Sequence, residues 1–476
     1  MDNTWEPVIG LEVHCQLATA TKLFCGCANT FGEEPNTHTC VVCSAQPGAL
    51  PVLNQGAVKH AVRACLALDA EVSEHSVFAR KNYFYCDLPK GYQISQYDRP
   101  LALGGGVALP DGSRVRFERI HMEEDAGKAI HDRGSRTLVD LNRAGVPLIE
   151  MVTEPDLSSS EEAKAFLVAL REILRYTRVS DGDMEKGSLR CDVNVSIHHP
   201  NTPFGVKVEV KNLNSIRHVG GAIEHEIARQ TEVLEGGGRV VQETRAWNPD
   251  RRETSTMRSK ENAEDYRYFP EPDLPPLVLA RDWIEDQRTL LVELPAARRS
   301  RFQGELGLSE YDAQVLCADR SVADLFEGTL ALGVAAKDLA NWITNDLMRA
   351  LGERDLELED GRLSAKGLAD LVRLVQEGTI HRSAGREVLG SMLESGKDAA
   401  TLVGELGLEQ ISDPSAIEAL CRTALLGRED VAAQVRDGKL KALGALVGPV
   451  MKASQGKANP KEVRDTLLRL IEDAAG

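Results

Sequence analysis

The sequence predicts an α+β protein, with a mainly antiparallel sheet domain followed by a helical region. Across residues 5–292, short runs alternate apolar with polar residues between frequent glycines and turn signals, as half-buried antiparallel strands do. After Pro295 the apolar residues recur at helical spacing instead. The length of 476 residues exceeds what one core can organise, so we expect this change of pattern to mark a domain boundary.

The first region combines strands with intervening helices. Residues 188–197 and 206–211 each place apolar side chains on one face and polar side chains on the other. Helical patterns occupy Ser160–Arg175 and His218–Leu234. Such a mixture is typical of an α+β domain with a largely antiparallel sheet.

The second region is expected to be helical throughout. Its clearest helical patterns cover Ser321–Leu332, Ala336–Leu351, Ala365–Glu377 and Pro460–Asp473, the last with proline at its first position. The sequence thus predicts a catalytic domain at 1–292, a helical domain at 293–405 and a helical tail at 406–476.

Composition limits the class of protein. Hydrophobic residues make up 42% and charged residues 27%, which is ordinary for soluble globular proteins. Nothing resembles a membrane span, and residues 1–6 lack the basic and apolar regions of a signal peptide, so we expect a cytoplasmic protein. The formal charge of −17 argues against a general nucleic-acid coat, although a local basic patch can still bind phosphate.

Four of the ten cysteines form a compact cluster in the sequence. Cys25 and Cys27 precede Cys40 and Cys43, and both pairs lie in a polar, turn-rich stretch. Four unrelated core thiols would not be expected in such surroundings, whereas four thiolates suit tetrahedral zinc. His38 is an alternative ligand, but four cysteines suffice without it. Because all-thiolate coordination leaves no open position, the pattern predicts a structural zinc site.

Carboxylates at three places in the sequence indicate a second metal site. Glu12 and His14 share one face of the strand VIGLEVHCQL, a pattern that, taken alone, a solvated face explains better than a metal site does. Glu150, however, interrupts the apolar run VPLIEMV, and burying a carboxylate is costly unless a cation or donors meet it. Glu124 lies in the acidic segment 121–125, which an exposed loop would also explain. Carboxylates with a histidine suit Mg²⁺ that holds polyphosphate.

The sequence contains no Walker A loop. Gly127-Lys128-Ala129 lacks both the earlier glycine and the closing hydroxyl residue of that motif. ATP would therefore bind on the sheet through Mg²⁺, arginine and lysine. The candidate ATP- and substrate-binding residues are Ser188, Arg190, Asp192, Asn194, Lys207, Glu209 and Lys211.

Several long motifs resemble the B subunit of the bacterial tRNA-dependent amidotransferases. They are VIGLEVHCQL, ARKNYFYCDLPKGYQISQ, HMEEDAGK, LVDLNRAGVPLIEMVTEPD, GSLRCDVNVSI, VEVKNLNS, DYRYFPEPDLPPL, LANWITNDL and VMKASQGKANP. Together they span almost the whole chain.

The resemblance implies an enzyme, a ligase of protein biosynthesis. It implies that ATP phosphorylates the side-chain carboxylate of Glu-tRNA(Gln) or Asp-tRNA(Asn), and that ammonia then displaces the phosphate. An amidase, the A subunit of the family's heterotrimer, would release the ammonia from glutamine, and a small C subunit would complete the assembly. The implied fold is a cradle-shaped catalytic domain related to glutamine-synthetase-like ligases, then a helical domain and a tRNA-binding tail.

The resemblance also assigns roles to residues. Glu12 and His14 fall in the first family motif, Glu124 in the second and Glu150 in the third, and all four match catalytic Mg²⁺ ligands. Residues 187–194 and 209–212 match ATP-pocket stretches. The zinc cysteines occur in only some members of the family.

The tail is the basic part of an acidic chain. Residues 436–469 contain eight basic and three acidic residues, a net charge of +5. A solvated helix surface explains this charge as well as a binding patch does. The resemblance favours tRNA, with Lys441, Lys452 and Lys457 as the expected contacts and Gly456 in a turn between the last two.

Two alternative functions make different predictions. A zinc-stabilised tRNA-binding scaffold without catalysis predicts gaps in the carboxylate set, yet Glu12, His14, Glu124 and Glu150 are all present. A stand-alone ligase for a small amino acid would not need the basic tail. The sequence shows no Ser-Ser-Lys signature of an amidase, so glutamine nitrogen requires a partner. Whether Glu-tRNA(Gln), Asp-tRNA(Asn) or both are substrates stays open.

Overall fold

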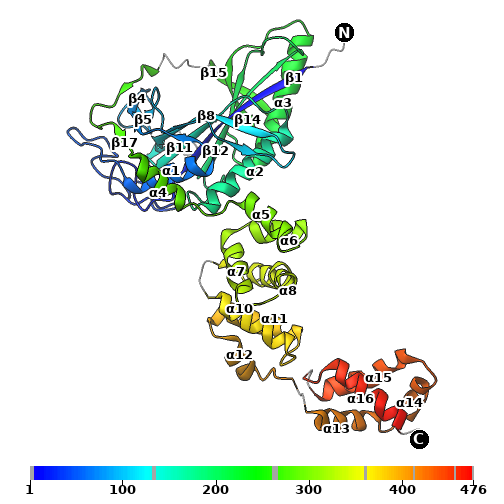
Figure 1. Ribbon diagram of the computed structural model, residues 1–476. Helices are drawn as coiled ribbons and strands as arrows, with labels where there is room; N and C mark the ends of the chain where they lie inside the picture. The colour runs from blue at the N-terminus through cyan, green and yellow to red at the C-terminus, as the bar shows by residue number, and fades with distance from the viewer. Residues whose placement is uncertain are drawn as a thin grey trace. The chain divides into compact units, whose positions relative to one another are not determined.

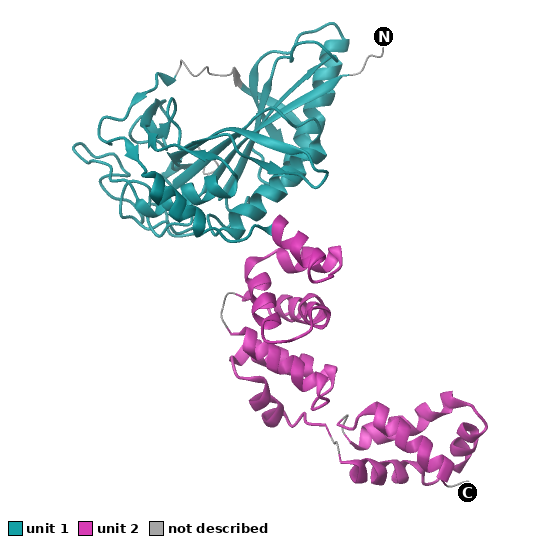
Figure 2. Ribbon diagram, in the orientation of Figure 1, with its two compact units in different colours: residues 1–295 teal, residues 296–476 magenta. Residues whose placement is uncertain are grey.

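The computed structural model describes residues 5–130, 136–259, 266–358, 362–410, 413–454 and 457–473 (Figure 1). The chain divides into two compact units, Met1–Pro295 and Ala296–Gly476 (Figure 2). The first unit contains the sheet and the second is helical, so the expected α+β fold is confirmed. Across the described ranges, every helix is too short or too polar to span a lipid bilayer.

A ten-stranded sheet organises the first unit. Its strand order is β15-β14-β13-β12-β1-β11-β8-β6-β2, and β7 pairs with β8. These strands are β1 (Glu6–Gln16), β2 (Glu71–Val72), β6 (Ala102–Leu103), β7 (Gly106–Ala108), β8 (Arg114–Glu124), β11 (Pro147–Thr153), β12 (Leu189–His198), β13 (Val208–Lys211), β14 (Glu243–Asn248) and β15 (Glu253–Ser259). The pairing is antiparallel throughout the described strands except between β13 and β14, which are parallel.

Helices cover the apolar face of this sheet. They are α1 (Gln55–Ala67), α2 (Ser160–Tyr176) and α3 (Ile216–Glu235), with α4 (Arg281–Thr289) beside α1. Leu11, Val13 and Cys15 of β1 point into one core with apolar residues of the three longer helices. Because successive strand residues alternate between faces, the polar residues of β1 lie on the opposite face of the sheet.

Three smaller sheets complete the unit. One has the order β16-β4-β5, from β16 (Phe269–Pro270), β4 (Phe78–Asn82) and β5 (Tyr92–Gln96). The others pair β9 (Lys128–Ile130) with β10 (Leu138–Asp140), and β3 (His75–Ser76) with β17 (Leu277–Val278). The backbone N–H of Met122 donates to Gln96 Oε1 at 2.9 Å, which holds β5 against β8.

The second unit contains two separate apolar cores. Buried residues between 302 and 403 form one, and buried residues between 417 and 471 form the other. The first core is built by α5 (Pro295–Gly304), α6 (Glu310–Cys317), α7 (Arg320–Leu330), α8 (Ala336–Asn341), the π-helix η2 (Trp342–Leu347), α9 (Met348–Gly352), α10 (Ala365–Gln376), α11 (Arg382–Ser395) and α12 (Ala399–Leu406). The second is built by α13 (Pro414–Leu425), α14 (Glu429–Arg436), the 3₁₀ turn η4 (Leu440–Leu443), α15 (Gly444–Ala453) and α16 (Pro460–Asp473).

Two details differ from the sequence-based expectations. The stretch expected as one helix from Ala336 to Leu351 has a π-helical turn at its centre. The strand expected from residue 206 begins at Val208, and Val206 is 45% exposed. Local alternation extended this strand beyond the residues that have a pairing partner.

Candidate functional site

A row of polar side chains crosses four adjacent strands of the large sheet. The antiparallel register pairs His14 of β1 with Arg190 of β12 on one side and with Glu150 of β11 on the other. Glu150 pairs in turn with His121 of β8. All four belong to the face that the helices do not cover, because they alternate with core residues along their strands.

The centre of this row has the geometry of a cation site. His14 Nε2 lies 3.5 Å from Glu150 Oε2 and 3.5 Å from Glu123 Oε1. Ligand atoms of these three residues all lie within 4.8 Å of one another. One imidazole with two carboxylates is a donor set that suits a hard divalent cation such as Mg²⁺ or Mn²⁺.

Electrostatic interactions within the row favour the charged form of the Glu150 carboxylate. Burial alone would raise the pKa of Glu150, but His121 and His14 hold it well below its ordinary value. Burial alone would lower the pKa of His121, but Glu150 and Glu123 raise it to about 9. His121 Nε2 lies 3.2 Å from Glu150 Oε2, so it supports a carboxylate that also faces His14.

Glu12 lies beside the cluster, one position along the same face of β1. It accepts a hydrogen bond from Asn194 Nδ2 at 2.9 Å. Burial, together with Glu150 and Glu209, raises the pKa of its carboxyl group. The structure therefore places Glu12 in the same cavity as His14 and Glu150, but outside the three-residue cluster.

The placement of Glu124 corrects a sequence-based expectation. Its side chain points to the other face of β8, where it accepts the backbone N–H of Ile94 at 2.9 Å and pairs with Lys90. Glu123 takes the position beside His14 that we expected for Glu124. Period-two alternation along RIHMEED already separates these neighbours, because it places Glu123 on the face of His121. The structure therefore places Glu124 outside the cluster in which it was expected to join His14 and Glu150.

Two cavities meet at this row. The larger, of about 320 Å³, contains Glu12 and Glu150, and the other, of about 270 Å³, contains Glu123 and Asp125. Of the predicted ATP- and substrate-binding residues, Arg190, Asp192, Lys207, Glu209 and Lys211 line one or both. Ser188 and Asn194 line neither cavity. The Asn194 side chain donates to Glu12, and the Ser188 carbonyl oxygen accepts a hydrogen bond from the Gln16 N–H at 2.8 Å.

Three cationic side chains in these cavities, Lys211, Arg190 and Arg143, are held by carboxylates. Lys211 Nζ lies 2.5 Å from Asp192 Oδ2 and 3.2 Å from Glu209 Oε1. Arg190 Nη2 lies 3.0 Å from Asp125 Oδ2, and Arg143 Nε lies 3.6 Å from the same oxygen. The cations are therefore fixed in place before any substrate arrives.

Sequence reasoning missed one lysine and a group of tyrosines. Lys81 lines both cavities. Burial alone would lower the pKa of its ammonium group, but the interactions with Tyr268 and Glu123 outweigh burial, and the pKa is raised. Tyr268 stacks on Tyr97, with ring centroids 4.3 Å apart and planes 8° apart, and Tyr266 lines the same cavity. Lys81, Tyr266 and Tyr268 fall in the motifs ARKNYFYCDLPKGYQISQ and DYRYFPEPDLPPL, and Tyr97 directly follows the first motif. These motifs were the available signal.

The four clustered cysteines converge as expected. Their sulfur atoms lie within 4.8 Å of one another, with Cys27–Cys43 at 4.0 Å and Cys40–Cys43 at 3.9 Å. Four sulfurs around zinc at ~2.3 Å would stand about 3.8 Å apart, so the set fits a tetrahedral zinc. A hydrogen bond with Cys25 lowers the pKa of Cys43 to about 4, against the effect of burial. The alternative ligand His38 instead turns its Nδ1 to Thr30 Oγ1 at 3.1 Å.

A buried lysine supports the cysteine cluster. Lys22 is fully buried, and its Nζ donates to the carbonyl oxygens of His38 at 2.8 Å and Leu141 at 3.2 Å. The same Nζ lies 3.6 Å from Cys43 Sγ. Its charge partly offsets the negative charge that four thiolates around one zinc ion would carry.

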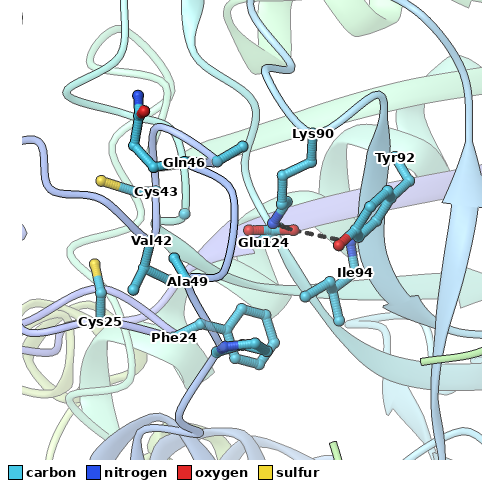
Figure 3. A pocket seen from close by; sticks show the side chains of 13 residues that line it. Phe24, Cys25, Val42, Cys43, Gln46, Ala49, Lys90, Tyr92, Ile94 and Glu124 are labelled. Carbon is cyan, nitrogen blue, oxygen red and sulfur yellow. Dashed lines mark hydrogen bonds and ion pairs between the residues drawn. The ribbon is translucent and has the colours of Figure 1, made fainter. Parts of the chain in front are cut away.

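A third cavity, of about 170 Å³, separates the cysteine loop from Glu124 (Figure 3). Phe24, Val42 and Cys43 form one side, and Lys90 and Tyr92 lie beside Glu124 on the other. Glu124 therefore lies in the cavity beside the cysteine loop, on the face of β8 opposite the three-residue cluster.

The predicted tRNA contacts lie on the second core of the helical unit. Lys441 of η4 and Lys452 of α15 are exposed, and Lys457 is partly buried. Gly456, expected in the turn between the last two lysines, lies outside the described residues.

Comparison with protein families identifies the chain. The family model described as the GatB/GatE catalytic domain matches residues 7–285, and the GatB domain matches residues 324–471. The chain belongs to the GatB family. The resemblance expected from the sequence motifs is thereby confirmed, as is the enzyme class, an amidotransferase of the ligase type.

Curated GatB proteins match over nearly their whole length. Each of the following is named as the B subunit of an aspartyl/glutamyl-tRNA(Asn/Gln) amidotransferase. The one from Geobacter sulfurreducens is 50% identical over 98% of this chain and 99% of its own. The one from Thermus thermophilus is 51% identical, again over 98% and 99%. The one from Persephonella marina is 49% identical over 98% of this chain and all of its own.

Proposed function

We propose that this GatB protein uses Mg²⁺ and ATP to phosphorylate the side-chain carboxylate of misacylated Glu-tRNA(Gln), Asp-tRNA(Asn) or both, and then transfers ammonia to it. The observation that carries the proposal is the cluster of His14, Glu123 and Glu150, built on central strands between two polar cavities. Phosphoryl transfer needs such a place, because its catalysis is mostly positioning and neutralisation of charge.

The three clustered residues would hold the metal. When bound, Mg²⁺ neutralises phosphate oxygens and draws charge from the bond that breaks. His121 keeps Glu150 charged, and β1, β8 and β11 hold the donors in place. Glu12 offers a further carboxylate on the same face.

The larger cavity suits the nucleotide. Lys207 and Lys211 supply positive charge on one side, and Tyr268 and its stacked partner Tyr97 offer aromatic faces on another. Lys81 stands where both cavities meet, so its ammonium would face the phosphoryl group in transit. Positive charge placed there stabilises the transition state.

The smaller cavity suits the aminoacyl end of the tRNA. Arg190 and Arg143 would meet the side-chain carboxylate, and Asp125 would meet the α-ammonium group. The carboxylate oxygen attacks the γ-phosphorus, the bond to ADP breaks, and an acyl phosphate results. Nitrogen of ammonia then attacks the acyl carbon, phosphate leaves with the bonding electrons, and the side-chain amide forms after loss of a proton.

Ammonia would come from glutamine through a partner. The sequence offers no amidase signature, so we propose a heterotrimer of this chain with an amidase, its A subunit, and a small C subunit. The cysteine cluster would carry a structural zinc that orders residues 25–43 next to the site. The second core of the helical unit, whose buried residues lie between 417 and 471 of the expected tail, would bind tRNA through Lys441, Lys452 and Lys457.

Reconstitution tests the proposal. The purified assembly is given ATP, Mg²⁺, ammonium and each misacylated tRNA in turn, and both released phosphate and amidated aminoacyl-tRNA are measured. We expect the two products to form in equal amounts and only with misacylated tRNA. Failure with both tRNAs, or amidation without ATP consumption, would refute it.

A further inference from the structure

Three arginines of the helical unit share one buried carboxylate. Asp346 belongs to the π-helix η2 within the motif LANWITNDL, and its side chain is 1% exposed. Arg382 donates to it from Nε at 3.2 Å and from Nη2 at 2.7 Å, and Arg386 donates from Nε at 2.7 Å. Arg349 Nη2 lies 3.5 Å away. We call these four residues the arginine cluster.

The arginine cluster carries more positive charge than Asp346 needs. One guanidinium would neutralise the carboxylate, so three leave a net charge of +2 within the cluster. Arg349 also lies 3.8 Å from Glu353, whereas Arg382 and Arg386 pair with no other carboxylate among the described residues. The arginine side chains remain 43–52% exposed, so N–H groups not used on Asp346 face solvent.

Packing around the arginine cluster fixes Arg382 in place. The Arg382 guanidinium lies over the ring of buried Trp342, 4.7 Å from its centroid. Gly385 permits the close approach of α11 to this ring, because a Cβ there would stand 2.8 Å from Trp342. Trp342 and Asp346 both belong to the π-helical turn, a rare conformation that is frequent at functional sites.

We propose that the arginine cluster binds the phosphate backbone of tRNA. Guanidinium groups match phosphate oxygens with paired hydrogen bonds, and arginines already held by Asp346 lose little conformational entropy on binding. The inference rests on the proposed function, which brings tRNA to this chain. Contacts of this kind position the nucleic acid without reading bases, and the lysines of the tail would be a second, separate contact.

The helical unit offers a matched control. On α10, Lys366 and Arg373 flank Asp370, with Lys366 Nζ at 2.6 Å and Arg373 Nη1 at 3.1 Å. This surface group has two cations and one carboxylate, a net charge of +1, so its excess positive charge is smaller than the +2 of the arginine cluster. The double variants Arg349→Gln/Arg386→Gln and Lys366→Gln/Arg373→Gln remove the same total charge.

The test measures tRNA affinity of the complete assembly as a function of salt. For the Arg349→Gln/Arg386→Gln variant we expect binding weaker on the order of thirtyfold at 0.1 M salt and little changed at 1 M. The slope of log Kd against log salt should fall by about 1.5, while the control variant keeps the wild-type slope. Arg382 stays on Asp346 and Trp342, so the fold should persist.

A second variant keeps the test decisive if the double variant fails to fold. Arg349→Gln alone leaves all three hydrogen bonds to Asp346, and it should give about half the change in slope. A slope equal to that of the control overturns the inference. If the variant instead fails to assemble with its partner subunits, while complexes that do form bind tRNA like wild type, the arginine cluster is a protein interface. That result would also overturn the inference. Wild-type protein that binds no tRNA at all would instead overturn the proposed function.

Discussion

His14 and Glu150 face each other as directly paired residues of β1 and β11, with His14 Nε2 3.5 Å from Glu150 Oε2. Both strands lie in the interior of the large sheet, so neighbours on both sides fix their backbones. The proposed metal donors are therefore positioned by backbone pairing and not by loops. Such a site is organised before substrate binds, which is what electrostatic catalysis requires.

The cysteine cluster is predicted to stabilise the fold before it affects chemistry. We expect one zinc per chain by elemental analysis, and Cys40→Ser should lower the melting temperature because one metal ligand is lost. Cys86→Ser, at an exposed cysteine outside the cluster, is the control and should melt like wild type. Zinc-free protein with unchanged melting and activity would contradict a structural zinc site.

Lys81 is predicted to act on the phosphoryl group. Lys81→Met keeps the side-chain length and removes the charge, so tRNA-dependent ATP hydrolysis should fall by about 10²–10³ at saturating substrate. The exposed Lys59 of α1 provides the control Lys59→Met, which should leave the rate unchanged. Equal rates in the two variants would show that Lys81 contributes nothing to the reaction.

The tail is predicted to supply tRNA affinity. Leu408 packs on the first helical core and Gln410 N–H donates to the Thr379 carbonyl at 2.8 Å, so a clean truncation begins at Asp413. Removing residues 413–476 should raise KM for misacylated tRNA strongly while the metal site of the first unit stays folded. The assay is amidation at increasing tRNA concentration.

A milder variant separates charge from folding in the tail. Replacing Lys452 and Lys457 by alanine should weaken tRNA binding less than truncation does, and should flatten its salt dependence. If truncation leaves both the affinity and the salt slope unchanged, the tail does not bind tRNA.

Local sequence patterns predicted much of the fold and part of the site. Alternation along 188–197 and along VIGLEVHCQL (8–17) predicted these strands and the correct faces for Glu12 and His14, because such alternation depends only on neighbouring residues. The same rule, applied to 121–125, would have chosen Glu123 over Glu124. The contributions of Lys81 and Tyr268 were beyond such reasoning, because only long-range pairing in the sheet β16-β4-β5 brings them to the cavity.

Glu123, and not Glu124, lies beside His14 and Glu150. This difference between neighbouring residues gives the most direct test of the proposed metal site. The measurement is Mn²⁺ affinity, as a stand-in for Mg²⁺, in wild type, Glu123→Gln and Glu124→Gln, with tRNA-dependent ATP hydrolysis followed in parallel. We predict that Glu123→Gln weakens Mn²⁺ binding by at least about a hundredfold and abolishes hydrolysis, since it removes one of three donors. Glu124→Gln should bind Mn²⁺ like wild type, because Glu124 faces Lys90 on the opposite side of β8. Wild-type Mn²⁺ affinity in Glu123→Gln, with a loss in Glu124→Gln, would contradict the proposed site.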